Sequence, residues 1–265
     1  MIRLQAHRGA SRDYPENTIV AYEGALKENY HIIELDPKFT KDHECVLLHD
    51  YTVNRTGRTK DGEKLPDKTD IRTLTLDEVR ELDFGVWFAP EFAGVKIPLF
   101  TEMLEFAIKN KAAIKVDNVA EDFSPEDRDK MFSLVHEYHA EEYVGFTCKS
   151  LEYAALVAES FPDSELHYDG PVSREILDKL KSSLKNNALT IWLPSDKKSW
   201  LPYPPADKET VEMAREYGKT ETFFDTNCKL FKGLPEKSVT WMSHGDYMEK
   251  VPDGFSLVAH SDACP

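Results

Sequence analysis

The chain of 265 residues is poor in cysteine and has no long apolar run. Its four cysteines are far apart and form no Cys-x-x-Cys spacing, so the sequence does not indicate a zinc site. No stretch approaches the roughly 18 apolar residues of a transmembrane helix, and the amino end lacks the pattern of a signal peptide. We therefore expect a protein of a reducing compartment, the cytoplasm, without membrane insertion.

Positive charge is also scarce. Lysine and arginine number 33 against 48 acidic residues, which gives a formal net charge of -15. An acidic surface repels phosphate groups, which argues against nucleic acid and against an anionic membrane as partners. The apolar fraction of 41% is adequate for one core. We expect one domain over residues 1–265, and the sequence leaves homo-oligomer formation open.

The stretch from Ile2 to Asp50 carries the clearest pattern. Residues 2–6 are typical of a strand, residues 17–30 have apolar positions at helical spacing, and residues 32–36 are typical of a second strand. A strand, a helix and a strand in this order predict two parallel, adjacent strands. Their carboxyl ends should therefore meet at the same edge of a sheet.

Polar side chains stand where these strands end. His7 follows the first strand, and Glu34 and Asp36 share one face of the second because they are two residues apart. Neighbouring carboxylates repel each other unless a proton, a basic side chain or a divalent cation neutralises them. Oxygen ligands favour a hard cation such as Mg²⁺, Ca²⁺ or Mn²⁺. Histidines such as His7 and His49 suit proton transfer near neutral pH.

The ordered set of these motifs resembles the glycerophosphodiester phosphodiesterase family. The set is His7-Arg8-Gly9, then Pro15-Glu16-Asn17-Thr18, then Glu34-x-Asp36 and His49-Asp50. The resemblance continues through residues 74–82, 93–94 and 97–104, and it covers about the first 120 residues. It implies that His7 and His49 are an acid/base pair, that Arg8 grips phosphate, and that Glu34 and Asp36 hold a divalent cation. A small-molecule phosphodiester is the implied substrate.

Strands and helices continue to alternate along the chain. We expect further strands at residues 112–118, 143–147, 165–168, 189–193, 222–224 and 239–242, and helices at 75–82, 101–110, 125–139, 150–160, 173–185, 207–217 and 245–250. Regular alternation implies a parallel sheet, and eight such units need about 250 residues. The predicted fold is α/β, a single (β/α)8 TIM barrel with an insertion after the second strand at about residues 51–100.

The third strand departs from the family pattern, which is Glu-x-Lys. Here the order is Lys115-Val116-Asp117, so the charge types are kept and their positions are exchanged. One interpretation is that Asp117 is the third metal ligand and Lys115 contacts phosphate. The alternative is that Lys115 itself neutralises Glu34 and Asp36, and that no metal binds.

Other candidates have ordinary structural alternatives. Glu16 could bind substrate, or it could build the first turn together with Asn17, in which case Asn17 or Thr18 caps the helix. Asp50 could orient His49, or it could form a turn. Trp192 could line a substrate pocket or pack in the barrel. The aromatic residues within 84–98 could form a wall for a ligand, or they could pack against one another.

Three functions remain open at this point. The first is a metal-dependent phosphodiesterase that cleaves glycerophosphodiester-like substrates by histidine acid/base catalysis through a cyclic phosphate, as the resemblance implies. The second is a phosphodiesterase or synthase for sugar phosphodiesters, because agrocinopine-type enzymes resemble the same family. The third is a barrel that binds a ligand without catalysis.

Overall fold

The structure is a computed structural model that describes residues 4–193, 206–216, 219–224, 237–241 and 259–261. The chain divides into two compact units. We call Leu4–Gly170 with Ser183–Leu189 the N-terminal unit, and Met1–Arg3, Pro171–Ser182 and Thr190–Pro265 the C-terminal unit. The predicted helix at 245–250 and the loop at 194–205 lie outside the described residues.

A parallel sheet forms the framework of the N-terminal unit. It has the strand order β1-β2-β5-β6-β7-β8. The bounds of its strands are β1 Gln5–Ala6, β2 Ile32–Leu35, β5 Ala113–Val116, β6 Val144–Cys148, β7 Leu166–Tyr168 and β8 Leu189–Ile191. The predicted parallel pairing of the first two strands is confirmed, with Gln5 opposite Ile32.

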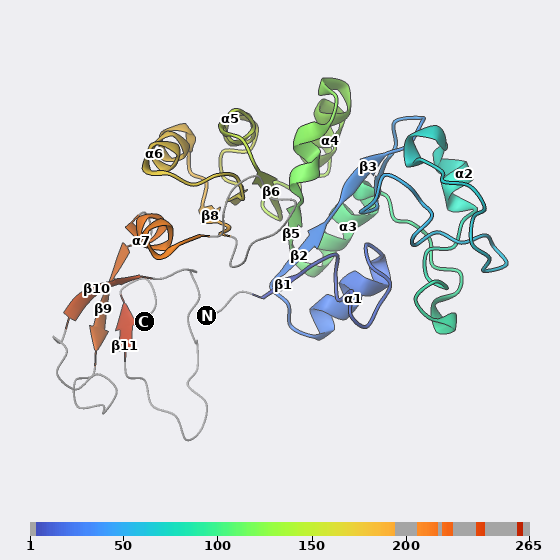
Figure 1. Cartoon of the computed structure of the whole chain (residues 1–265), viewed down its shortest axis with the longest axis horizontal. Coiled ribbons are helices and arrows are strands. Elements are labelled where there is room, and N and C mark those ends of the chain that lie inside the picture. The colour runs from blue at the N-terminus through green and yellow to red at the C-terminus, as the bar shows by residue number, and fades with distance from the viewer. Residues whose placement is uncertain (1–3, 194–205, 217–218, 225–236, 242–258, 262–265) are drawn as a thin grey trace, which may run out of the picture. The chain divides into compact units, whose positions relative to one another are not determined.

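Helices connect these strands close to the predicted positions. They are α1 Ile19–Lys27, α3 Phe100–Asn110, α4 Pro125–Glu137 and α5 Leu151–Ser160, with the short 3₁₀ helix η3 Asn118–Asp122 after β5. Apolar side chains of the strands and helices form the core, which includes the fully buried Ile33, Phe100 and Val157. Figure 1 shows β1, β2, β5 and β6 following one another, with the part of the unit around α2 extending away from them.

The segment between β2 and α3 has its own small core. It contains the antiparallel strands β3 Pro37–Phe39 and β4 Cys45–Leu47, the 3₁₀ helices η1 Ile71–Thr73 and η2 Pro90–Phe92, and the helix α2 Leu76–Arg80. The predicted capping box of Thr75 and Glu78 is confirmed at the start of α2. Seven buried side chains form the core of the segment: Val46, Leu48, Val53, Ile71, Val79, Phe84 and Ile97. This packing gives the residues after β4 a defined position.

The C-terminal unit corrects part of the predicted topology. Its helices are α6 Arg174–Ser183 and α7 Lys208–Glu216, and its strands are β9 Lys219–Phe224, β10 Lys237–Trp241 and β11 Ala259–Ser261. The last residue of α6, Ser183, already belongs to the N-terminal unit. The predicted strands 222–224 and 239–242 overlap β9 and β10, but these strands pair antiparallel with each other, and β11 pairs antiparallel with β9. Their expected role as the seventh and eighth parallel strands was therefore wrong for this structure.

Among the described residues, no helix has the length and apolar character needed to cross a bilayer.

Candidate active site

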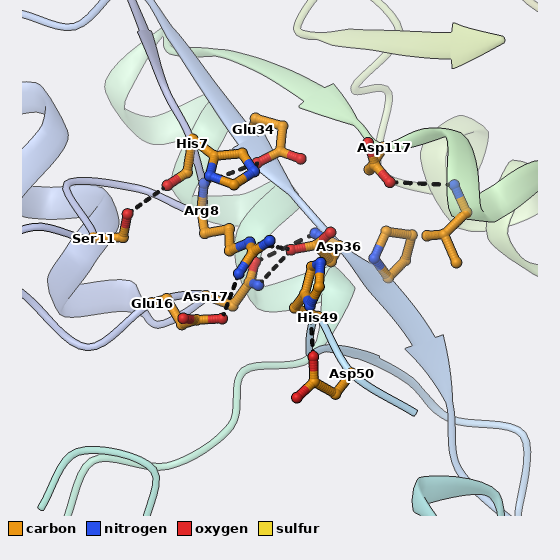
Figure 2. A network of polar contacts seen from close by, with 12 residues as sticks. His7, Arg8, Ser11, Glu16, Asn17, Glu34, Asp36, His49, Asp50 and Asp117 are labelled. Atoms are coloured by element: carbon orange, nitrogen blue, oxygen red, sulfur yellow. Dashed lines mark hydrogen bonds and ion pairs between the residues drawn. The ribbon is translucent and has the colours of Figure 1, made fainter. Parts of the chain in front are cut away.

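Three carboxylates gather at the carboxyl edge of the parallel sheet. Glu34 lies in β2, Asp36 follows it, and Asp117 follows β5. Because β2 and β5 are parallel with Leu35 opposite Val116, the residues after these strands are neighbours, and the Asp117 N–H donates to the Leu35 carbonyl at 3.0 Å. One ligand atom from each of the three carboxylates lies within 4.8 Å of the others. We call this group the acid cluster (Figure 2).

Burial makes the charge of the acid cluster costly. Burial and the neighbouring Asp36 carboxylate raise the pKa of Glu34 to about 8, although Lys115 acts in the opposite direction. Lys115 stands opposite Glu34 in the sheet and is buried. The lysine therefore offsets only part of the burial and repulsion that raise the pKa of Glu34. Three oxygen ligands in one small space fit a hard divalent cation.

The loop after β1 brings His7 and Arg8 to the acid cluster. The Arg8 N–H donates to Glu34 Oε2 at 2.8 Å, and His7 Nε2 lies 3.9 Å from the same oxygen. Arg8 and Gly9 both have left-handed backbone angles, with φ of 60° and 79°. A Cβ at Gly9 would lie 2.8 Å from the Ala21 backbone, so the loop packs directly on α1.

The His7 ring is exposed to solvent, and its surroundings favour the neutral imidazole. Partial burial and the charge of Arg8 lower the pKa of His7, and His49 acts in the same direction. The carboxylates of Asp36 and Asp117 oppose this shift. The Leu48 N–H donates to the Asp36 carbonyl at 2.8 Å, which brings His49, the next residue, to the acid cluster (Figure 2).

Asn17 holds Asp36. Its Nδ2 donates to Asp36 Oδ2 at 2.7 Å, and its Oδ1 accepts the Tyr22 hydroxyl at 3.1 Å. The helix cap is Thr18, whose hydroxyl accepts the Ala21 N–H. Of the two predicted caps, Thr18 is therefore the one that caps the helix, and Asn17 contacts the acid cluster instead.

Asp50 holds His49, as one of the two interpretations predicted. His49 Nδ1 and Asp50 Oδ1 are 2.6 Å apart. Burial would raise the pKa of Asp50, but hydrogen bonds with Arg55 and His49 outweigh burial and lower it. Because an ionised carboxylate can only accept, His49 Nδ1 carries the hydrogen and Nε2 of the neutral ring has the lone pair.

Glu16 is engaged by two arginines. Its Oε1 accepts Arg8 Nη1 at 3.1 Å and Arg55 Nη2 at 2.7 Å, while its Oε2 accepts Arg55 Nη1 at 2.8 Å. Burial would raise the pKa of Glu16, and the two arginines lower it. The Glu16 carboxylate therefore contacts Arg8, the predicted phosphate ligand, and its own role in substrate binding stays a prediction.

The remaining predicted residues are less central. Trp192 lies just after β8 in the C-terminal unit with 37% of its surface exposed, and the site above is built from the N-terminal unit alone. The aromatic residues within 84–98 pack on one another and on Tyr14, with Phe88 and Phe92 centroids 5.7 Å apart. This packing supports the interpretation of the segment as self-packed.

Two further residues near the site had no sequence signal. Arg55 stands in a polar stretch that indicated only a loop, and Lys38 follows the second strand as an ordinary charged residue. Lys38 is 2% exposed, and its Nζ lies 5.1 Å from the centre of the Tyr51 ring. Burial lowers the pKa of Lys38, while Asp36 and Asp117 oppose that shift. Only the folded chain brings these cations to the acidic site.

An edge of a parallel sheet that carries an acid cluster, two histidines and an arginine defines a class of protein that handles phosphate esters. The profile of the glycerophosphoryl diester phosphodiesterase family matches residues 7–175. The chain belongs to this family, and the predicted resemblance is confirmed.

Individual relatives agree with the family assignment. Glycerophosphodiester phosphodiesterase of Caldanaerobacter subterraneus subsp. tengcongensis is 35% identical over 140 residues, which cover 52% of this chain and 54% of that protein. The enzyme of the same name from Bacillus subtilis is 35% identical over 108 residues, 38% of this chain and 34% of that protein. The chain thus spans about half or less of the length of these two relatives.

The fold is also similar to a solved structure. A glycerophosphoryl diester phosphodiesterase from Parabacteroides distasonis matches with a TM-score of 0.60 and 22% identity, over 81% of this chain and 67% of that one. At this identity the similarity concerns the fold.

Proposed function

We propose that the protein is a metal-dependent phosphodiesterase that cleaves glycerophosphodiester-like substrates. The observation that carries the proposal is the acid cluster lying beside His7 and the His49–Asp50 pair. Glu34, Asp36 and Asp117 would hold a divalent cation such as Mg²⁺, Ca²⁺ or Mn²⁺. When bound, such an ion supplies positive charge that stabilises the phosphoryl oxygens.

The protein's own side chains would carry the proton transfers. One histidine of the pair His7 and His49 takes the proton from a substrate hydroxyl next to the ester, and that oxygen attacks phosphorus to form a cyclic phosphate. The other histidine protonates the departing alcohol, and water then opens the ring. Arg8 and Lys115 add positive charge for the phosphate oxygens, which an acidic protein needs if it binds an anion.

The proposal extends to the rest of the chain. We propose that the parallel sheet is part of a TIM-barrel fold with the segment 51–100 as an insertion, and that the protein is cytoplasmic. The similarity to the Parabacteroides distasonis structure supports the barrel as a fold. The predicted role of Trp192 in substrate binding stays a prediction.

A substrate panel tests the proposed function. Glycerophosphodiesters and sugar phosphodiesters are offered to the metal-loaded protein, and phosphate-containing products are followed by ³¹P NMR. We expect cleavage of a glycerophosphodiester by the wild-type protein and none by His7→Ala. Cleavage of sugar diesters alone would favour the agrocinopine-type alternative. Binding without turnover, unchanged in His7→Ala, would favour a ligand-binding barrel.

A further inference from the structure

Arg55 connects the two parts of the site, and no function was assigned to it above. We infer that Arg55 is a positioning residue that fixes His49 through Asp50 and Arg8 through Glu16. The expected change in kcat rests on the proposed function, whereas the expected change in the His49 tautomer rests on geometry alone.

The contacts of Arg55 reach two carboxylates from different segments of the chain. Its Nε donates to Asp50 Oδ2 at 2.7 Å, and its two terminal nitrogens donate to the two oxygens of Glu16 at 2.8 and 2.7 Å. Glu16 lies before α1, and Asp50 lies after β4. A guanidinium group presents several donors in a fixed plane, so one side chain can hold both carboxylates in a fixed relation.

Each of these carboxylates holds a residue of the proposed chemistry. Asp50 accepts from His49 Nδ1 at 2.6 Å, and Glu16 accepts from Arg8 Nη1 at 3.1 Å. Arg8 in turn contacts the acid cluster, since its Nε lies 3.4 Å from Asp36 Oδ2. The chain of contacts therefore runs from His49 through Asp50, Arg55, Glu16 and Arg8 to Asp36.

The fixed Asp50 carboxylate determines the tautomer of His49. With Asp50 ionised and held by Arg55, the Nδ1–H tautomer of His49 is favoured and its Nε2 is available to a substrate proton. Without Arg55, Asp50 loses the guanidinium group that fixes its direction, and the His49 ring gains freedom to rotate and exchange tautomers. Positioning by a neighbouring carboxylate is a recognised requirement for catalytic and metal-bound histidines.

Arg55 could also stabilise the fold, since its side chain is 40% exposed but that of its bidentate partner Glu16 only 12%. A purely stabilising role would change the free energy of unfolding and leave the His49 tautomer unchanged, whereas a positioning role changes the tautomer. Arg72 is a control because it makes the same kind of ion pair, from Nε and Nη2, with a single carboxylate, that of Asp70, and its guanidinium also lies over the Tyr51 ring.

The test compares Arg55→Ala, Arg55→Lys and the control Arg72→Ala with the wild-type protein. Long-range ¹H–¹⁵N spectra of the histidines report the tautomer of His49 without any substrate. We expect the Nδ1–H form to dominate in the wild type and in Arg72→Ala, and a mixture of tautomers in Arg55→Ala. Arg55→Lys keeps the positive charge but loses the planar guanidinium group, so its tautomer ratio should lie between those of the wild type and Arg55→Ala. If Arg55→Ala fails to fold, Arg55→Lys provides the same test.

Kinetics on the best diester of the panel give a second readout. We expect kcat to fall about 10- to 100-fold in Arg55→Ala, the range found when groups that orient active-site ligands are removed. Added guanidinium ion should restore part of this loss. The kcat of the double variant Arg55→Ala/Asp50→Asn should be no lower than that of the less active single variant, because the effects of substituting residues that act as a unit are not additive.

Two results would overturn the inference. The first is a His49 tautomer in Arg55→Ala that matches the wild type, and this result counts even if no diester is turned over. The second is a kcat within twofold of the wild type with no guanidinium effect. Failure of the wild type on every diester, together with the expected tautomer change, would defeat the proposed function and leave the positioning role in place.

Discussion

At the scale of single residues, Asp117 is the side chain whose role most needs a test. Its carboxylate completes the acid cluster, and its Oδ2 also accepts the Val119 N–H at 3.4 Å. The order Lys115-Val116-Asp117 left two interpretations open, a third metal ligand or a lysine in place of the metal. The position of Asp117 beside Glu34 and Asp36 supports the first.

Asp117→Asn should weaken divalent cation binding by at least about tenfold, equal to about 1.4 kcal/mol, because the ion loses one charged ligand. Isothermal titration with Mg²⁺, Ca²⁺ and Mn²⁺ measures the affinity. Asp122→Asn is a matched control, since Asp122 is an exposed carboxylate paired with Lys149 at 2.7 Å. Equal affinity of Asp117→Asn and the wild type would exclude Asp117 as a ligand.

The raised pKa of Glu34, about 8, predicts how cation binding depends on pH. Below this pKa a cation must displace the proton of Glu34, so the affinity should increase as pH rises from 6 and level off above 8. Isothermal titration calorimetry in buffers of different ionisation enthalpy measures how many protons are released when the cation binds. Glu34→Gln removes the titrating group, and the slope of affinity with pH should then become smaller. An affinity that falls with rising pH would contradict the assignment.

Some residues of the site could be predicted from the sequence, and others could not. His7, Asp36 and Asp117 follow strands and Glu34 lies near the end of one, so the alternation of strand and helix places them at one edge. Arg55 lies in a loop, where no periodic pattern determines where a side chain points. Local preference favours Asn17 or Thr18 as a helix cap, but the contact of Asn17 with Asp36 depends on β2, which lies later in the chain.

At the scale of elements, the loop from β1 to α1 determines where His7 and Arg8 lie. Gly9 has a φ of 79° and packs against the Ala21 backbone. Gly94 has a similar φ of 92°, but a Cβ there would meet nothing within 4 Å. Comparing alanine substitutions at Gly9 and Gly94 therefore distinguishes the cost of backbone strain from the cost of steric contact.

Gly94→Ala should cost about 1 kcal/mol of unfolding free energy, from backbone strain alone. Gly9→Ala should cost about 2–4 kcal/mol because the contact with α1 adds to the strain, and it should also lower kcat by displacing His7 and Arg8. Urea unfolding measures the free energies. Equal losses for the two variants would show that the packing of Gly9 on α1 has no energetic role.

The helices were easier to predict than the strand pairing at the end of the chain. The helix limits agree with the sequence within a few residues, because helical spacing and caps such as Thr75 are local signals. The pairing of β9 with β10 was not predicted. Strand pairing depends on contacts between distant segments, and alternation alone does not reveal whether a pair is parallel or antiparallel.

At the scale of the whole molecule, the protein is an acidic chain with local positive charge at its site. The net charge is -15, yet Arg8, Lys38, Arg55 and Lys115 gather around the carboxylates of the N-terminal unit. An anionic substrate requires such a positive region. The division into two compact units has no signal in the sequence, because no change in composition marks it, and the single domain over residues 1–265 stays a prediction.

The central claim is that a divalent cation held by Glu34, Asp36 and Asp117 is needed to cleave a phosphodiester beside His7 and His49. The most direct measurement is the rate of glycerophosphodiester cleavage after complete chelation and after re-addition of Mg²⁺, Ca²⁺ or Mn²⁺. The account predicts that cleavage stops on chelation, returns with a divalent cation, and does not return in Glu34→Gln/Asp36→Asn. Cleavage that continues at the same rate in the chelated protein would contradict it.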